Sequence, residues 1–200
     1  MSGIFEILTK QLGGQQLDSI SRQIGGDSGT TSKAIAAALP MLMTALASNA
    51  QKPGGAEALS AALGRDHDGG ILDNMDGFLN NPGAVNGAGI LGHVLGSKQP
   101  TVETGLAKTT GLDMGSVTKL LPILAPLVMG ALGKQQRQSQ LDASGLSNML
   151  GQERQQIESS VPQMGIVGKF LDADGDGDMD LGDLGSLAKS TGLLGKLFGG

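Results

Sequence analysis

The fold is decided by the stretch Ala38-Leu39-Pro40-Met41-Leu42-Met43-Thr44-Ala45-Leu46, which recurs 86 residues later as Leu124-Ala125-Pro126-Leu127-Val128-Met129-Gly130-Ala131-Leu132. In each copy and its flank, apolar side chains are spaced three or four residues apart, which is the repeat of one face of an α-helix. They are Ile35, Leu39, Leu42 and Leu46 in the first copy, and Leu121, Ala125, Val128 and Leu132 in the second. Because both segments are apolar on their other faces too, we expect two long and largely buried helices.

Proline occupies the same position in both predicted helices, as Pro40 and Pro126. A proline inside a helix costs roughly 3 kcal/mol and leaves one backbone carbonyl without its usual partner. We interpret each proline as a kink that curves its helix around a neighbour, in preference to a functional hinge.

The repeated stretch belongs to a longer internal duplication, which pairs residues 15–64 with residues 101–151. Each copy has a Gly that can end a helix in the left-handed conformation and, two residues later, an Asp that can cap the next helix. These residues are Gly25 and Asp27 in the first copy, and Gly111 and Asp113 in the second. We therefore predict helix, turn, long helix, loop and helix in each copy. The expected fold is one all-α, multihelical bundle in which the two pseudo-repeats bury their apolar faces against each other.

The composition limits what such a protein can bind. The net charge is −5 and the 14 basic residues are scattered, whereas binding to a phosphate backbone needs clustered Lys and Arg. Aromatic residues make up only 2% of the chain, all of them Phe, so platforms for base stacking are scarce. The chain has no Cys, which excludes disulfides, thiol catalysis and Cys-ligated zinc. We expect no nucleic-acid partner.

The start of the chain and its apolar stretches resemble neither a secretory signal nor a membrane span. Glu6 interrupts the N-terminal segment and no long apolar run follows it, unlike a secretory signal. The most apolar stretch, residues 120–132, has 13 residues and two prolines, whereas a bilayer-spanning helix needs about 20 residues. The default expectation is a cytoplasmic protein, and export by a non-classical route stays open.

Residues 65–98 join the two copies and contain several polar side chains of the kinds found in metal and acid–base sites. These are Asp66, His67, Asp68, Asp73 and His93. Their spacing matches no metal-binding loop, so we favour the interpretation that Asp68 or Asp66 caps a short helix over residues 69–79. His93 lies among apolar residues, and we expect it to be a half-buried helix residue with one hydrogen bond.

Three features of the chain together are typical of a known family. They are the turn Asp66-His67-Asp68-Gly69 with Ile71-Leu72-Asp73, the stretch Gly89-Ile90-Leu91-Gly92-His93-Val94-Leu95-Gly96, and the helices with Leu-Pro-x-Leu. In these features the chain resembles the bacterial YidB-like family, also called domain of unknown function 937. The resemblance covers about residues 1–160, and the Asp-rich C-terminal segment looks like the tail of some members. It implies an all-helical, multihelical fold in a bacterial protein, and it implies no chemistry.

The C-terminal segment Asp172-Ala173-Asp174-Gly175-Asp176-Gly177-Asp178-Met179-Asp180-Leu181-Gly182-Asp183 matches a calcium-binding loop of EF-hand type. Such a loop takes oxygen ligands at positions 1, 3, 5, 7, 9 and 12, and a Gly at position 6 for the sharp turn. With Asp172 at position 1, the ligands are Asp172, Asp174, Asp176, Asp178 through its carbonyl, Asp180 and Asp183. Asp183 stands where Glu is usual, as in dockerin-like loops. The alternative is an acidic turn without a bound ion.

Hard oxygen ligands predict Ca²⁺ as the bound ion, and Mg²⁺ is the alternative, although it prefers stricter octahedral geometry. Apolar residues at helical spacing flank the loop on both sides. We therefore predict two domains, a helical one over residues 1–160 and a helix–calcium loop–helix tail over residues 161–200. No second complete loop is present in the sequence, so the predicted site is solitary.

The sequence thus favours a non-enzymatic, calcium-binding structural or interaction protein, in which calcium orders a C-terminal arm that can support self-assembly. The expected partner is another protein or a second copy of the chain. Two alternatives are kept. One is a metal-assisted hydrolase that uses Asp66, His67, Asp68 and His93, although the chain has no recognisable nucleophile motif. The other is a peripheral membrane-binding protein that uses residues 190–198, although that segment has only one Lys and surface helices usually have more basic charge.

Overall fold

The computed structural model describes residues 3–160, and every regular element in this part of the chain is helical. In chain order these are α1 (Ile4–Gln11), α2 (Gln15–Ile24), α3 (Ser28–Gln51), α4 (Gly55–Asp66), α5 (Gly70–Asp73), α6 (Met75–Asn80), η1 (Pro82–Ala84), α7 (Gly87–Leu95), η2 (Gly96–Lys98), α8 (Gln99–Thr110), α9 (Met114–Gln138) and α10 (Ala143–Ser160). The all-α prediction is therefore confirmed. The structure separates a unit that ends at Arg154 from the rest of the chain, and the packing below is that of this unit.

The internal duplication appears as two runs of three helices. The first run is α2, α3 and α4, and the second is α8, α9 and α10, in the order that the sequence predicts. The glycines between the first and second helix of each run have left-handed backbones, with φ of 81° at Gly25 and 76° at Gly111. Both therefore end a helix in the way that their position in the sequence indicated.

The aspartates that follow these glycines cap the two long helices. The Asp27 carboxylate accepts a hydrogen bond of 2.9 Å from the Thr30 N–H, and the Asp113 carboxylate accepts one of 3.0 Å from the Ser116 N–H. Hydrogen bonds from the side chains of Thr30 and Ser116 are the main reason that the pKa of each carboxyl lies below its usual value. The predicted caps are confirmed, and both stay ionised at neutral pH.

The duplication starts earlier than residues 15 and 101, where the sequence analysis placed it. The short helices α1 and α7 precede α2 and α8 in the same way, and each is followed by a glycine with an unusual backbone. Gly14 has φ 58° and ψ −128°, and Gly96 has φ 55° and ψ −135°. Residues with a Cβ avoid this conformation. The two glycines lie 82 residues apart instead of 86, so the copies make a similar sharp turn at positions that differ by four residues. Each copy therefore comprises at least four helices, and α5 and α6 follow α4 of the first copy.

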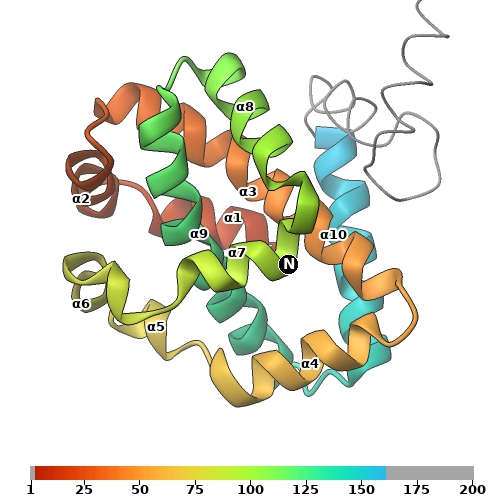
Figure 1. Cartoon of the computed structure of the whole chain (residues 1–200). Coiled ribbons are helices and arrows are strands. Elements are labelled where there is room, and N and C mark those ends of the chain that lie inside the picture. Colours follow the sequence, from red (N-terminus) through yellow and green to blue (C-terminus); the bar gives the residue numbers. More distant parts are fainter. Residues whose placement is uncertain (1–2, 161–200) are drawn as a thin grey trace, which may run out of the picture. The chain divides into compact units, whose positions relative to one another are not determined.

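The two copies pack across each other. Helix α2 of the first copy contacts α9 of the second, and α8 of the second copy contacts α3 of the first. Likewise, α1 and α7 each contact both long helices. At one of these crossings the buried Ser116 hydroxyl lies 2.8 Å from the Ile24 carbonyl oxygen, which therefore shares the single hydroxyl proton with the Asp113 carboxylate. Figure 1 shows α1, α7 and α9 close together, with α2 and α6 to one side of them. The copies thus share a single core with approximate two-fold symmetry.

Helices α3 and α9 supply most of that core. All apolar residues that the periodicity selected are buried, with exposed fractions between 0% and 4%. Pro40 and Pro126 lie inside these helices, and Pro122 lies inside α9 as well. By length and composition both helices could cross a membrane, and 67% and 78% of their most apolar windows are buried inside the structure. The apolar stretch at 120–132 is part of a helix of 25 residues, so its length alone does not separate a core helix from a membrane span.

Candidate functional site

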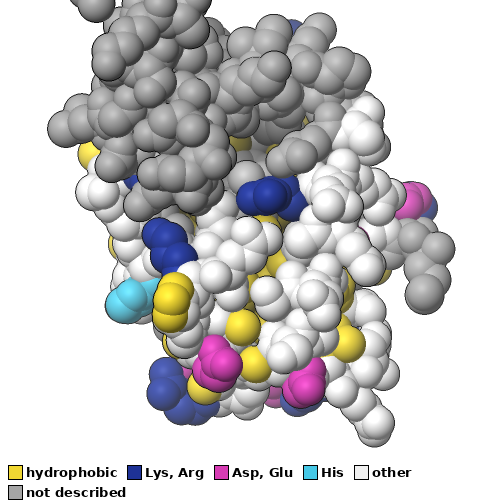
Figure 2. Space-filling view, turned by 90° about the vertical axis from the view of Figure 1, so that its right-hand side faces the viewer, with side chains coloured by type: hydrophobic (Ala, Val, Ile, Leu, Met, Phe, Trp, Pro, Cys, Tyr) yellow, Lys and Arg dark blue, Asp and Glu magenta, His cyan; other side chains and the backbone are white. Residues whose placement is uncertain are grey.

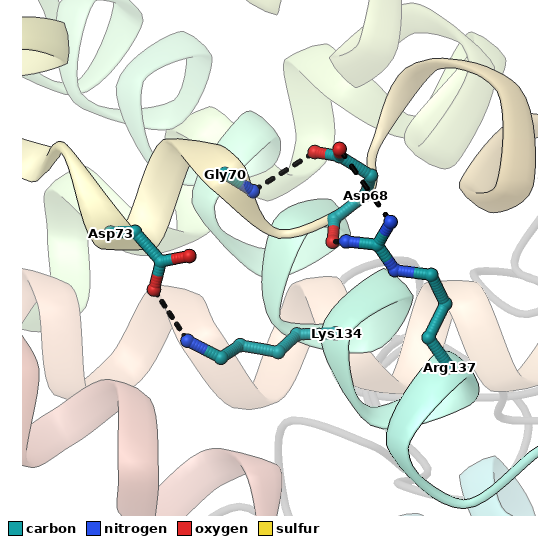
Figure 3. Close-up of polar contacts among 5 residues, drawn as sticks. All are labelled: Asp68, Gly70, Asp73, Lys134 and Arg137. Carbon is teal, nitrogen blue, oxygen red and sulfur yellow. Dashed lines mark hydrogen bonds and ion pairs between the residues drawn. The ribbon is translucent and has the colours of Figure 1, made fainter.

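The best-defined polar cluster of the described residues lies where the turn after α4 meets the last turns of α9 (Figure 3). The Asp68 carboxylate accepts a hydrogen bond of 2.9 Å from the Gly70 N–H. Arg137 of α9 donates to the Asp68 carbonyl oxygen, and its Nη1 lies 3.6 Å from the Asp68 carboxylate. The Lys134 ammonium lies 2.5 Å from the Asp73 carboxylate. Two ion pairs therefore connect the turn and α5 to α9.

Glycines on α9 let the backbone of this turn approach very closely. A Cβ on Gly133 would overlap the His67 carbonyl oxygen, and a Cβ on Gly130 would overlap the Ile71 side chain. Gly69 is buried, with φ of 95°, and a Cβ there would lie 2.7 Å from Cβ of Lys134. The turn thus rests directly on the helix, and the ion pairs lie at its edge.

The structure modifies two predictions for this segment. Asp68 does bond to the start of the following helix, since its carboxylate accepts from the Gly70 N–H, but the residue at the capping position is Gly69, which has no side chain to act as a cap. The single helix expected over residues 69–79, however, is two short helices that meet at Asn74. The Asn74 side chain accepts a hydrogen bond of 3.2 Å from the Gly77 N–H. Such side chains compete with the helical backbone for its N–H groups, which explains the break.

The remaining candidate residues differ in their surroundings. Asp66 is exposed and pairs with Arg65 at 2.6 Å, and this hydrogen bond keeps the pKa of the Asp66 carboxyl below its usual value. His67 is half-buried, and burial lowers the pKa of its imidazole, which is therefore neutral at pH 7. His93 is exposed, so the prediction that it is half-buried is wrong. It lies on the outer side of α7, whose buried side consists of Leu91, Val94 and Leu95.

The candidate side chains do not form a metal-binding cluster. Among residues 3–160, no group of three or more His, Asp or Glu side chains is placed to hold a metal ion. The set Asp66, His67, Asp68 and His93 is therefore not assembled as a group of ligands, and its use in hydrolysis stays a prediction. The ligands proposed at residues 172–183 lie outside the described residues.

Sequence reasoning missed Lys134 and Arg137, which are the partners of the acidic turn. They lie three residues apart, which places them on one side of α9. The equivalent positions of the first copy, 86 residues earlier, are Ser48 and Gln51. A comparison of the two copies would therefore have singled out this basic pair, because the long helices otherwise match closely.

Helices α1, α5 and α9 also enclose a hollow of about 110 Å³. It is lined by Ile4, Ile7, Gln11, Leu72, Ala131, Lys134, Gln135 and Gln138. Pockets for drug-sized ligands are typically about 300–1,000 Å³, so the hollow suits only a small group. In the part of Figure 2 that is not grey, a few basic, acidic and hydrophobic side chains are scattered among other residues, and the basic ones form no continuous area there.

The chain has one informative similarity to known proteins. A family model described as "Bacterial protein of unknown function (DUF937)" matches residues 6–135. The chain belongs to this family. The match includes α3, α9 as far as residue 135, and the acidic turn of the DUF937 protein, and it is shorter than the expected resemblance over residues 1–160. No curated protein and no solved structure matches the chain.

The acidic turn of this DUF937 protein allows a test of which contact holds it. Asp68→Ala removes both the hydrogen bond to the Gly70 N–H and the ion pair with Arg137, so we expect a loss of about 1 kcal/mol of unfolding free energy. Asp68→Asn keeps an oxygen for the Gly70 N–H and removes only the charge, so we expect a loss of less than about 0.5 kcal/mol. Urea denaturation followed by circular dichroism measures the stability of both variants. If Asp68→Ala and Asp68→Asn lost equal stability, the ion pair with Arg137 would hold the turn instead of the hydrogen bond to Gly70.

Proposed function

We propose that this DUF937 protein is a non-enzymatic, calcium-binding interaction protein in which one Ca²⁺ ion orders the C-terminal arm. The observation that carries the proposal is the series of aspartates at residues 172–183, which supplies an oxygen ligand at every position of an EF-hand loop. The Gly at the sixth position, Gly177, suits the sharp turn that this loop requires.

The charges of the segment support a bound cation. Six aspartates fall within these twelve residues, and no Lys or Arg occurs between Phe170 and Ala188. In the helical body, by contrast, Asp66, Asp68 and Asp73 each have a basic partner. Carboxylates at this density repel one another unless a cation neutralises them. All ligands are hard oxygens, which favours Ca²⁺ over zinc or copper, with Mg²⁺ as the competitor.

The role that fits best is an ordering clamp. The loop is solitary and ends in Asp183 instead of the usual Glu, and a shorter side chain is less suited to bind the ion with both oxygens. We therefore expect weaker binding than in paired sensor loops. The segment after the loop holds Leu193, Leu194, Leu197 and Phe198, which gives the ordered arm an apolar surface for a protein partner or a second copy.

Calorimetric titration of the full chain with CaCl₂ tests the proposal. We expect one Ca²⁺ ion per chain, weaker binding of Mg²⁺, and loss of the binding heat in the double variant Asp172→Ala, Asp176→Ala. The matched control is Asp66→Ala, Asp68→Ala, which removes the same number of carboxylates from the turn after α4 and should bind Ca²⁺ like the original chain.

Two results would contradict the proposal. A binding heat that survives in the loop variant and disappears in the turn variant would move the metal site to residues 66–68. Absence of binding at millimolar CaCl₂ would remove calcium from the function altogether. Light scattering during the same titration reports self-assembly, and a mass that stays monomeric at all calcium concentrations would limit the arm to partners other than a second copy.

A further inference from the structure

The internal duplication predicts a counterpart for α5 and α6. In the first copy these helices follow α4, and α5 contacts α9 while α6 contacts α2. In the second copy, the segment that follows α10 begins at residue 161. Gly165-Ile166-Val167 there corresponds to Gly70-Ile71-Leu72, and Phe170-Leu171 corresponds to Phe78-Leu79 after a deletion of three residues. The chain contains the dipeptide Phe-Leu at these two places only.

Glycine followed by isoleucine marks the same correspondence. This dipeptide occurs four times, beginning at residues 3, 70, 89 and 165. The occurrences at 3 and 89 lie near the starts of α1 and α7, which hold corresponding places in the chain before α2 and α8. The occurrence at 70 begins α5. We pair the occurrence at 165 with it, as the occurrences at 3 and 89 are paired. The duplicated unit therefore extends from α1 to α6, and its second copy extends from α7 to about residue 171.

From this correspondence we infer that α3 carries a docking surface for residues 165–171 of the same chain. In this proposal the segment packs on α3 in the same way that α5 packs on α9. The inference goes beyond calcium binding and does not require it. In the first copy the equivalent segment is followed by Asn80-Asn81-Pro82-Gly83, which is not a calcium loop, yet α5 and α6 are docked.

The surface of α3 is open where that of α9 is covered. Gly130 of α9 is buried beneath Ile71, and its equivalent 86 residues earlier is Thr44. Thr44 is only partly buried, and so is Ser48 one turn later, whereas the residues on either side of Thr44 are buried. Thr44 and Ser48 therefore define the surface of α3 on which Ile166 would pack.

The ion pairs of the first contact have no charged counterpart in the proposed second contact, either on α3 or in the segment that would pack on it. On α9, Lys134 and Arg137 pair with Asp73 and Asp68. The equivalents on α3 are Ser48 and Gln51, and the equivalents of the two acids are Gly168 and Gln163. Both members of each ion pair are thus replaced by uncharged residues. If only the helix residues or only the segment residues had lost their charge, an unpaired charge would remain. Because both have lost it, the proposed contact has no unpaired charge at these positions.

The length of chain fits the same placement. Three residues separate the end of α4 at Asp66 from Gly70, and four residues separate the end of α10 at Ser160 from Gly165. Helix α10 also lies beside α3, since a Cβ on Gly151 would be 3.9 Å from the Gln51 side chain. One difference is that Ala47 stands where α9 has Gly133. With this extra methyl group on α3, the proposed contact leaves more room between segment and helix than the first contact does.

Engineered cysteine pairs test this contact, because the chain has no Cys of its own. The test pair is Thr44→Cys with Ile166→Cys in the full chain. The positive control is Gly130→Cys with Ile71→Cys, because a Cβ at position 130 would meet the Ile71 side chain directly. The negative control is Ser32→Cys with Ile166→Cys, because Ser32 is exposed on α3 about 18 Å from Thr44 along the helix axis.

Mild oxidation should cross-link the test pair within one chain at least about tenfold faster than the Ser32 pair, because a disulfide needs Cα atoms within about 7 Å. Non-reducing gels and peptide mass spectrometry measure the rate and the site. A rate equal to that of the Ser32 pair, or products that are mainly dimers at low protein concentration, would overturn the inference. The cross-link should form with chelator as well as with CaCl₂, so a failed calcium titration and a failed cross-link are separate results.

Discussion

Replacement of Gly133 by alanine is expected to lower the free energy of unfolding by about 3 kcal/mol, at the upper end of the usual cost of adding atoms to a packed site. The new methyl group would overlap the His67 carbonyl oxygen, which belongs to the backbone and cannot rotate away. The turn after α4 would have to rise from α9, and the ion pair between Arg137 and Asp68 would be stretched. Inside a helix alanine is otherwise favoured over glycine, so the loss would come from the contact with the turn and not from α9 itself.

The matched control is Gly105→Ala in α8, where a Cβ would meet nothing within 4 Å. Alanine is favoured over glycine inside a helix by about 0.5–1 kcal/mol, so this variant should be more stable than the original chain. In thermal denaturation followed by circular dichroism, a change of 3 kcal/mol corresponds to a decrease of about 6–12 °C in Tm. If Gly133→Ala were as stable as Gly105→Ala, the close contact between the turn and α9 would be wrong.

The sequence predicts the long helices and their buried faces because those properties depend on neighbours within one or two turns. Spacing of apolar residues selected Leu39 and Val128 correctly. The caps at Asp27 and Asp113 could be predicted for the same reason, since each bonds to a backbone N–H three residues later.

Contacts between distant parts of the chain were not predictable in this way. The pairing of Asp68 with Arg137 joins residues 69 positions apart, and the spacing within the turn contains no information about the end of α9. The exposure of His93 was also missed, because apolar neighbours in sequence do not show which side of a helix faces the core. The same limit applies to Gly133, whose role depends on the His67 carbonyl of another segment.

The duplication itself was only partly predictable. Its central part was found through the matching long helices, but α1 and α7 share little more than Gly3-Ile4 and Gly89-Ile90 at the same offset. In the structure their correspondence rests on their places before α2 and α8 and on the similar backbones of Gly14 and Gly96, which lie 82 residues apart. For the candidate site, the sequence supplied the acidic residues of the turn and the structure supplied their basic partners, while the calcium loop rests on the sequence pattern.

Replacement of Leu39 by alanine should lower the free energy of unfolding by about 2–5 kcal/mol, which is the usual cost of a leucine-sized cavity in a core. Leu39 is 0% exposed and lies on α3, which contacts α9 of the other copy and the crossing helix α8. Because each copy buries its apolar face against the other, the cavity weakens both copies together. We therefore expect one unfolding transition, shifted to lower denaturant with an unchanged slope.

The control for the Leu39 variant is Ile7→Ala, which removes a side chain of similar size that is 37% exposed. Surface substitutions usually change stability by less than about 1 kcal/mol, so its midpoint should stay close to that of the original chain. The chain has no Trp or Tyr, and circular dichroism at 222 nm, which reports all helices, is the suitable signal for guanidinium denaturation. Two separate transitions in the Leu39 variant would mean that the copies fold independently, because a shared core requires α3 and α9 to unfold in one step.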